Sequence, residues 1–297
     1  MHIPVLLNET LEILGPKPGE LCVDGTLGEG GHALEVINKI SPGGIFVGID
    51  RDPDSISAFQ KKVENLIGKD KLEINLILAN DNFMNMEKIL KNKKLNKADC
   101  VLLDLGFSSR QLEVGRGFSF LKDEPLLMTY KKDATPLKEV LKNLSEEEIF
   151  NIIKNYGEER YAKRIARAIF EREKNKPVET SGELAELIKN SVPRNYERGR
   201  IHPATRTFLA FRIYTNQELE SLEKFLDSLE AILSPGARVG VISFNSLEDR
   251  IIKHTFRLLA KRNILKILTK KPIRPSLEEI KNNPRSRSAK LRAAIKV

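Results

Sequence analysis

A cluster of glycines directly after a short apolar stretch constrains this chain more than any other feature of its sequence. Leu21, Cys22 and Val23 are typical of a buried strand, which ends at Asp24, and a helical pattern opens at Ala33. Strand, glycine turn and helix is the geometry in which bare backbone approaches a ligand and a helix N-terminus points at it. Residues 21–32 therefore predict a binding loop within an α/β fold, with glycines at Gly25, Gly28, Gly30 and Gly31.

Acidic residues beside this loop indicate the class of ligand. Residues 28–33 fit the G-x-G-x-x-A pattern of dinucleotide-binding loops, which leaves a nicotinamide cofactor open. Asp24 and Glu29, however, place negative charge where a pyrophosphate would lie. Acids next to a glycine loop are better suited to a ligand that carries an ammonium group and hydroxyls, such as S-adenosylmethionine.

Two further apolar runs also end in an acid. Asp50 follows the run 45–49 about twenty residues after the glycines, where a ribose is held in such folds. Asp104 follows the run 101–103, and its alternative role is that of a helix or turn cap. Since ligands of open α/β sheets bind outside the carboxyl ends of the strands, these acids are expected beside the loop. Phe83 follows the strand expected at 72–78 and is expected either to contact an adenine or to lie in the core.

The order of the elements predicts an α/β domain interrupted by helices. Further strands are expected near 239–244, 263–269 and 289–297, and the last two lack room for a crossover between them. We therefore predict seven strands in a mostly parallel sheet with an antiparallel edge. Because 115–214 is helical without a convincing strand, the expected domains are a discontinuous core, 1–114 and 215–297, and a helical insertion, 115–214.

Composition excludes several classes of protein. No apolar run approaches a membrane span, and the first residues lack the layout of a signal peptide. Cys22 and Cys100 lie inside apolar runs and are expected to be reduced core residues, which fits the cytoplasm. The four histidines are scattered, so no metal site is expected. The sequence leaves a monomer and a homodimer open.

The positive charge is concentrated near the end of the chain. The net charge is +9, but residues 261–297 hold twelve Lys or Arg and two acids, so residues 1–260 come to −1. Such an excess predicts contact with a phosphate backbone, and a solvated surface is the alternative. The helical block also carries closely spaced arginines among aromatics, a pattern that suits RNA; these include Arg194, Arg198, Arg200 and Arg206.

Eight motifs are spread in order over nearly the whole chain. They are His2–Leu6, Asp24–His32, Asp50–Pro53, Leu103–Leu112, Arg116–Phe120, His202–Phe208, Ser246–Arg250 and Asn283–Arg292. In order and spacing they resemble the ribosomal small-subunit methyltransferase H family, which methylates the exocyclic N4 of a cytosine in the 16S rRNA decoding centre.

The resemblance implies a class I S-adenosylmethionine-dependent methyltransferase fold, Rossmann-like, with an inserted helical domain. It implies that the substrate is 16S rRNA within the small subunit or a late precursor. Donor contacts are expected from Asp24 and, by resemblance, from Gly30, Gly31, His32, Asp50, Phe83, Asp104 and Gln111. Asp104 with Ser108, or a backbone carbonyl of that turn, is expected to accept the amino proton. On the RNA side we expect Phe107, Asn245, Arg285 and Arg287 besides the four arginines of the helical block.

Two positions depart from the pattern of the family. Asn245 stands where the family usually has histidine, and it cannot take up a proton near neutral pH. Leu127 stands where the family has an acid. Alternative functions are a nicotinamide-dependent oxidoreductase, a non-catalytic RNA-binding protein on this scaffold, and a DNA amino-methyltransferase, whose usual Pro-Pro-aromatic motif is replaced here by Leu105-Gly106-Phe107.

Overall fold

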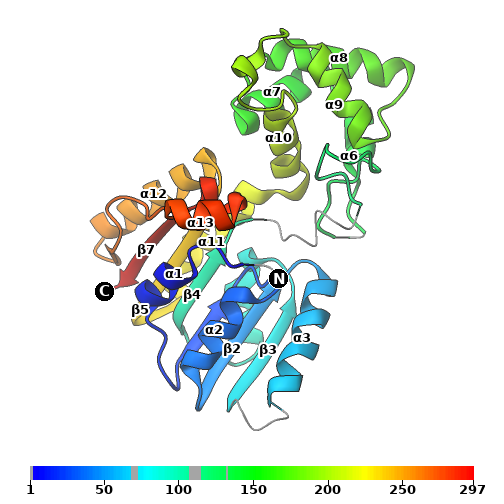
Figure 1. Cartoon of the computed structure of the whole chain (residues 1–297). Coiled ribbons are helices and arrows are strands. Elements are labelled where there is room, and N and C mark those ends of the chain that lie inside the picture. The colour runs from blue at the N-terminus through cyan, green and yellow to red at the C-terminus, as the bar shows by residue number, and fades with distance from the viewer. Residues whose placement is uncertain (1–2, 68–72, 107–114, 132) are drawn as a thin grey trace. The chain divides into compact units, whose positions relative to one another are not determined.

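The computed structural model describes residues 3–67, 73–106, 115–131 and 133–297, and it divides into two compact units. Unit 1 comprises residues 1–107 and 219–297, and unit 2 comprises residues 108–218. The described part of each unit contains its own hydrophobic cluster, and unit 2 is drawn mainly in green in Figure 1.

The strands of unit 1 form one seven-stranded sheet in the described residues, in the order β3-β2-β1-β4-β5-β7-β6. Its pairs are parallel except those of β7 with β5 and with β6, so the expected mostly parallel sheet is confirmed. The antiparallel strand is β7, which lies one place inside the edge formed by β6. The strands are β1 Leu21–Asp24, β2 Gly44–Asp50, β3 Ile74–Asn80, β4 Ala98–Asp104, β5 Leu233–Ser243, β6 Leu265–Ile267 and β7 Lys290–Lys296.

Strand β5 begins earlier than the sequence predicts. A strand is expected near 239–244, but β5 starts at Leu233, before the turn-forming residues Ser234, Pro235 and Gly236. These residues form an irregularity inside the strand, since Leu233 pairs with Ala98 and Arg238 pairs with Cys100. Gly236, at φ +78°, supplies the left-handed backbone that this bulge needs.

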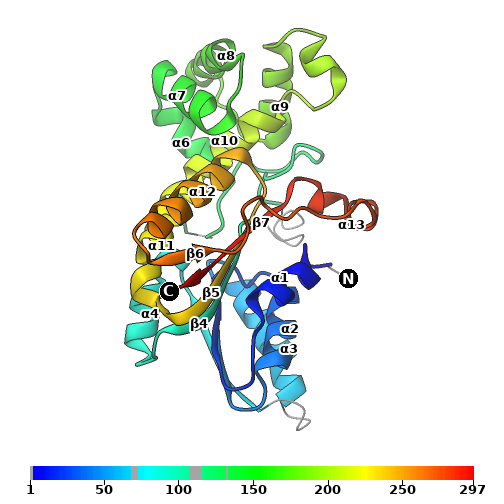
Figure 2. The same cartoon turned by 90° about the vertical axis from the view of Figure 1, so that its left-hand side faces the viewer.

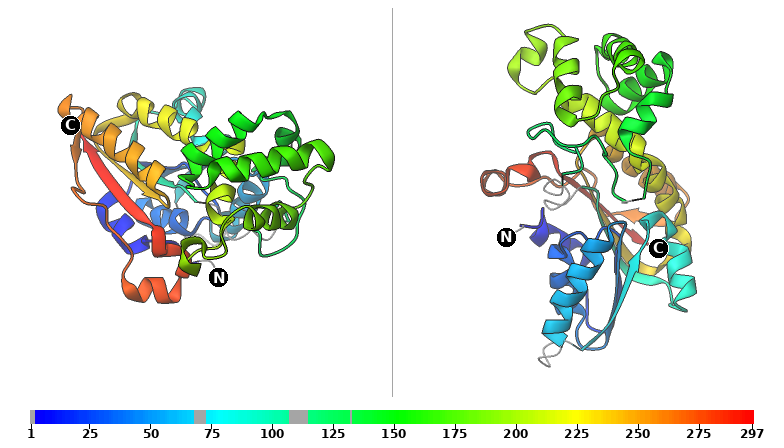
Figure 3. Two further views of the ribbon diagram at one scale, coloured as in Figure 1. Left: turned by 90° about the horizontal axis from the view of Figure 1, so that it is seen from above. Right: turned by 90° about the vertical axis from the view of Figure 1, so that its right-hand side faces the viewer.

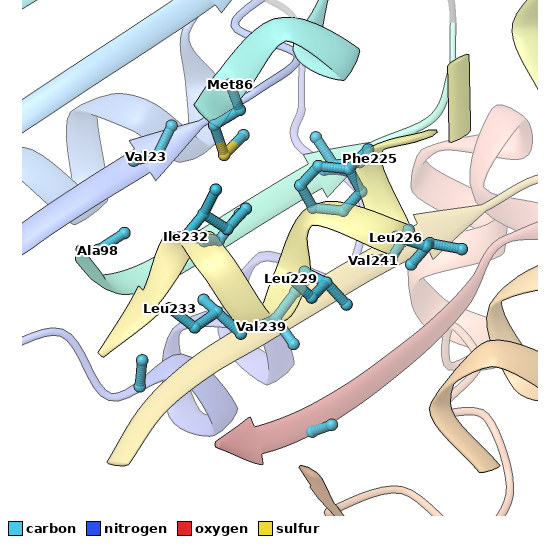
Figure 4. Close-up of a cluster of buried hydrophobic side chains, with 14 of the residues drawn as sticks. Val23, Met86, Ala98, Phe225, Leu226, Leu229, Ile232, Leu233, Val239 and Val241 are labelled. Atoms are coloured by element: carbon cyan, nitrogen blue, oxygen red, sulfur yellow. The ribbon is translucent and has the colours of Figure 1, made fainter. Parts of the chain in front are cut away.

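Helices cover both faces of the sheet in unit 1 (Figure 2). On one face α2 and α3 pack against β1 and β2, and on the other α4, α11 and α12 pack against β1, β4 and β5. The face of α11 that points inward repeats at helical spacing, as Figure 4 shows for Phe225, Leu226 and Leu229. The helices are α1 Leu7–Leu14, α2 Gly31–Ile40, α3 Pro53–Ile67, α4 Met86–Asn92, α11 Glu218–Ile232, α12 Ser246–Lys261 and α13 Leu277–Asn282, with 3₁₀ turns η1 Phe83–Asn85 and η3 Pro284–Ser288.

The two cysteines lie opposite each other on neighbouring strands. Cys22 of β1 is in register with Cys100 of β4, and both are buried free thiols, as expected. The hydrogen bond to Cys100, together with burial, raises the pKa of the Cys22 thiol well above its usual range. These thiols therefore act as small core side chains.

The helices of the described part of unit 2, drawn mainly in green in Figure 3, pack around an apolar cluster. Ser145 and Glu148 form a capping box at the start of α7. Thr180 caps α9 by accepting from Glu183 N, whereas the Glu183 carboxylate accepts from Glu179 N. The elements are α6 Leu137–Asn143, α7 Glu146–Gly157, α8 Ala162–Asn175, α9 Ser181–Asn190, η2 Tyr196–Gly199 and α10 Thr205–Asn216.

The segment before α6 is held by its own polar contacts. The buried Arg116 guanidinium donates to Tyr130 O at 2.6 Å, and Gly117 N donates to the Glu124 carboxylate at 3.0 Å. Gly117 has φ +71°, and a Cβ there would lie 2.6 Å from Pro125 O. This motif of the resemblance thus shapes a loop. Across the described residues, no helix is both long and apolar enough to span a membrane.

Substitution of Gly30 tests how tightly the start of α2 is packed. Gly30 has φ +74°, and an added Cβ would lie 2.1 Å from the Phe59 ring, so Gly30→Ala meets both backbone strain and overpacking. We expect urea denaturation to show a loss of about 3 kcal/mol. Gly43→Ala is the control, because Gly43 has φ +79° but open space around it, and it should cost about 1 kcal/mol. Equal losses in the two variants would contradict the packing argument.

Candidate functional site

Three carboxylates lie at the ends of three adjacent parallel strands. Asp24 is in register with Gly48 of β2 and with Leu102 of β4. Asp50 and Asp104 therefore each stand two residues farther along their strands, about 7 Å at the usual rise. Asp24 is buried at 4% exposure, whereas the Asp104 side chain is 21% exposed. The acids predicted to meet are thus brought together, with Asp24 set back between the other two.

Asp50 fastens the glycine loop to the sheet. Its Oδ2 accepts from Gly28 N at 2.7 Å, and its Oδ1 accepts from Asp52 N at 2.8 Å. Burial raises the pKa of Asp50, and these two backbone N–H groups act against that rise. A carboxylate oxygen can accept more than one hydrogen bond, so Asp50 can still accept from the hydroxyls of a ribose.

Three of the four glycines of the loop lie against side chains of the protein itself. A Cβ on Gly25 would lie 2.3 Å from Leu103 Cδ2, and one on Gly31 would lie 2.4 Å from Pro4 Cγ. A Cβ on Gly30 would lie 2.1 Å from the Phe59 ring. Besides the approach of a ligand, which the sequence predicts, packing inside the protein therefore favours glycine at these three positions. The helix α2 nevertheless begins here without a side-chain cap, so its N-terminus can receive an anionic group such as a carboxylate.

His32, in the first turn of α2, is held in one tautomer. Its Nε2 lies 2.9 Å from Val5 O, and because a carbonyl only accepts, Nε2 carries the proton. Burial lowers the pKa of His32, so the ring is neutral near pH 7 and its Nδ1 has a lone pair. That Nδ1 lies 3.7 Å from Asp104 Oδ2. A ligand cation could lie against both of these acceptors.

Residues 3–6 join this site to the C-terminal part of unit 1. Pro4 fills the space above Gly31, and Val5 O accepts from His32. Leu6 N donates to Glu279 Oε1 of α13 at 2.8 Å, and Asn283 Nδ2 donates to Ile3 O at 3.1 Å. The first described residues are therefore part of the wall of the site.

Thr26 connects two of the three acids and was missed by the sequence argument. Its Oγ1 accepts from Asp104 N at 2.6 Å and lies 3.4 Å from Asp24 Oδ1, to which it donates. Its own backbone N–H also donates to Asp24 Oδ1, at 2.9 Å. A hydroxyl two residues after a strand-end acid is a weak signal, because only the pairing of β1 with β4 brings Asp104 to it.

The pKa of Asp24 is raised by its surroundings. Burial raises the pKa of Asp24 to about 6, and the nearby Asp104 and Asp50 carboxylates add to the rise. Thr26 N–H and His32 act in the opposite direction. A positively charged ligand near these acids would lower the pKa of Asp24, so its carboxyl group would become more fully ionised when the ligand binds.

Phe83 lies in η1, after β3, at the same end of the sheet. Its Cβ would be 3.0 Å from a Cβ at Gly25, and its ring meets the edge of Phe225 with centroids 6.0 Å apart. The ring is half-buried, so it belongs to the core and also borders the loop. Asn82 caps this turn by accepting from Met84 N.

Asn245, expected on the RNA side, caps helix α12. Its Oδ1 accepts from Leu247 N and Glu248 N, both at 3.0 Å, and Glu248 Oε2 accepts from Asn245 N in return. Its Nδ2 is buried and has no hydrogen-bond partner among the described residues. An ion pair also fixes the same helix, since Arg292 Nε donates to Asp249 Oδ1 at 2.6 Å and lowers the pKa of Asp249 against the effect of burial.

The expected RNA-side arginines are divided between the two units. Arg194, Arg200 and Arg206 belong to unit 2, where Arg194 and Arg200 are exposed and Arg206 is half-buried. Arg285 and Arg287 are exposed in η3 of unit 1. Four expected positions lie outside the described part of the structure: Phe107, Ser108 and Gln111 altogether, and the side chain of Arg198. Among the described residues, no group of three or more His, Cys, Asp or Glu could hold a metal ion.

The perturbed acid makes stability depend on pH. The folded state binds the Asp24 proton more tightly than the unfolded state, whose pKa is near 3.8, so ionisation costs stability as pH rises through 4 to 6. Relative to wild type, Asp24→Asn should gain about 2 kcal/mol between pH 4 and pH 7 in urea denaturation. The opposite effect of His32 is common to both proteins and largely cancels in the difference. A difference that does not change with pH would contradict the raised pKa.

The bridging hydroxyl can be removed with little change in shape. Thr26→Val leaves Asp104 N without its acceptor, which should lower the free energy of unfolding by about 1–3 kcal/mol. Thr26→Ser keeps the hydroxyl and is the matched control. Thermal or urea denaturation of the three proteins measures the difference, and equal losses in the Val and Ser variants would show that the methyl group and not the hydroxyl matters.

Comparison with known proteins gives one consistent family. The description "MraW methylase family" applies to the match over residues 1–297. Curated relatives named "Ribosomal RNA small subunit methyltransferase H" are 42% identical in Halothermothrix orenii, over 100% of this chain and 98% of the relative, and 42% identical in Clostridioides difficile, over 100% and 99%. A relative of the same name in Syntrophus aciditrophicus is 41% identical over 100% of this chain and 98% of its own. The chain belongs to the MraW methylase family.

Proposed function

We propose that this protein transfers a methyl group from S-adenosylmethionine to the exocyclic N4 of one cytosine in the decoding centre of 16S rRNA. One observation carries the proposal: the three acids Asp24, Asp50 and Asp104 lie at the ends of β1, β2 and β4, and Asp50 is hydrogen-bonded to the glycine loop. The names of the relatives support an rRNA substrate of the small subunit. The site of methylation within that RNA is inferred from the resemblance of the motifs.

The residues present fit this methyl donor better than a nicotinamide dinucleotide. Asp24, Asp50 and Asp104 concentrate negative charge, which favours a ligand with ammonium and sulfonium groups and opposes a pyrophosphate. Asp50 can accept from ribose hydroxyls, and the start of α2 at Gly30 and Gly31 can receive a carboxylate. His32 and Asp104 can bind the ammonium, Phe83 borders the space for an adenine, and Gln111 is proposed as a further contact. When bound, S-adenosylmethionine supplies a methyl carbon on a sulfonium, whose carbon–sulfur bond breaks as the amino nitrogen attacks.

Asp104 is proposed to accept a hydrogen bond, and then the proton, from the amino group of the base. The amino nitrogen of cytosine shares its lone pair with the ring and is a poor nucleophile. A carboxylate that accepts a hydrogen bond from one N–H makes the nitrogen more nucleophilic and then takes that proton. The partly exposed Asp104 carboxylate, held at its backbone by Thr26, is suited to this role, with Ser108 or a carbonyl of the following turn as its aid.

Positioning is proposed to supply most of the acceleration. A correctly aligned pair of reactants gains up to about 7–11 kcal/mol, whereas a general base contributes about 10²- to 10⁴-fold. The base must leave its stack to be reached, and Phe107 is a candidate for stacking on it. Asn245 lies three residues after Ile242, the register partner of Asp104, and its buried Nδ2 is a donor for a carbonyl of the base.

Basic residues of both units are proposed to bind the RNA backbone. Residues 261–297 carry a net charge of +10, and Arg285 and Arg287 are exposed there. In the helical insertion, proposed for substrate recognition, the candidates are Arg194, Arg198, Arg200 and Arg206. We further propose that the substrate is the assembled small subunit or a late precursor in the bacterial cytoplasm, bound by a monomer or a homodimer.

Removal of the Asp104 carboxylate tests the mechanism. Asp104→Ala should lower methyl transfer to small subunits that lack the modification by about 10²-fold or more. Transfer is measured with labelled S-adenosylmethionine, and nucleoside mass spectrometry identifies N4-methylcytidine. Asp227→Ala, which removes an exposed acid of α11, is the control and should keep normal turnover. Near-normal turnover of Asp104→Ala would exclude Asp104 from the reaction, and absence of N4-methylcytidine with wild type would exclude the proposed function.

A further inference from the structure

Three aromatic rings in unit 2 form a path from the core to the surface. Phe208 of α10 is buried, and the Phe120 ring meets it edge-on, with centroids 5.2 Å apart and an interplanar angle of 81°. His202 then stacks on Phe120, with centroids 4.4 Å apart and planes inclined by 20°. His202 itself is exposed. A flat ring is thus presented at the surface with its inner face supported.

The orientation of His202 is fixed by its surroundings. Ala204 N donates to His202 Nδ1 at 3.2 Å, which leaves the proton of the neutral ring on Nε2. Pro203 restricts the backbone of His202 to extended conformations. The segment is anchored on both sides, because Ala204 is fully buried and the buried Tyr196 donates to Glu159 Oε2. Little rotational freedom therefore remains to be lost when a ligand stacks on the ring.

The accessible part of His202 has a definite chemical character. Phe120 stacks on one face of the ring and Ala204 N binds its Nδ1 edge, so the other face and the Nε2 edge are the parts that a ligand can contact. Leu121, the residue after Phe120, adds an apolar side chain that is 87% exposed. Arg200, two residues before His202, is exposed and positively charged. A flat apolar face beside a cation and an N–H donor matches an unpaired nucleobase with its phosphate.

We infer that the outer face of His202 is a stacking platform for one unpaired base of the RNA, outside the position of the methylated cytosine. The inference rests on the proposed RNA substrate and adds a contact made by the helical unit. Stacking holds a base without reading its identity, since every base has an aromatic face. Nε2–H is then free to donate to a phosphate or a base carbonyl. His202 is thereby distinguished from the arginines, which contact the backbone through charge.

Short single-stranded RNA oligonucleotides that carry 2-aminopurine test the platform directly. Stacking quenches the fluorescence of this base, and anisotropy gives the dissociation constant in the same sample. His202→Ala should weaken binding about five- to a hundred-fold and remove the quenching at one position of the probe. His202→Phe keeps a flat ring and should retain both. His254→Ala, which removes another exposed histidine, on α12, should behave as wild type.

Salt dependence separates stacking from charge. His202→Ala should leave the slope of log affinity against log salt unchanged. Arg200→Ala should reduce the magnitude of this slope by the amount that corresponds to about one phosphate contact. Wild-type affinity and quenching in His202→Ala would overturn the platform, and so would a loss in His202→Phe as large as that in the Ala variant. Methyl transfer by wild type to small subunits is measured separately. Its absence would remove the proposed function, while the quenching experiment still decides whether a base stacks on His202.

Discussion

The parallel pairing of β1 with β2 and β4 is the constraint on which the site of this methylase depends. Neighbouring strands that run in the same direction end at the same edge, so acids at three strand ends meet without any long-range sequence signal. The register also sets their depth, because Asp24 is withdrawn by two residues. Burial at that depth keeps Asp24 half-ionised near pH 6, and the Thr26 hydroxyl joins it to the backbone of Asp104.

Local sequence patterns were sufficient to predict the part of the site formed by residues at strand ends. The strand ends Asp24, Asp50 and Asp104 follow from apolar runs that each stop at an acid. What could not be predicted depends on residues distant in the chain. Gly30 must be glycine because Phe59 fills its place, and the sequence offers no sign of that contact. Thr26 matters only because β4 lies beside β1.

The same limit applies to the overall fold and to the motifs. The seven-stranded sheet was predicted from periodicity, but the early start of β5 was not, because a bulge absorbs the turn signal at Gly236. Residues of the motifs also divide into two physical groups. Arg116 and Asp249 hold loops and helices in place through hydrogen bonds and ion pairs, whereas His202 is exposed. A sequence motif alone does not distinguish structural residues from exposed ones, since both groups consist of polar residues.

The contacts of residues 3–6 have a consequence for how the molecule is made. Val5 contacts His32, while Leu6 is hydrogen-bonded to Glu279 and Ile3 to Asn283, so residues 3–6 and residues 279–283, far apart in the sequence, lie together beside the acids. Strand β7 is inserted between β5 and β6, although it follows both of them in the sequence. During translation the wall of the site therefore stays incomplete until α13 has been synthesised. A nascent chain that has not reached α13 lacks part of the finished site.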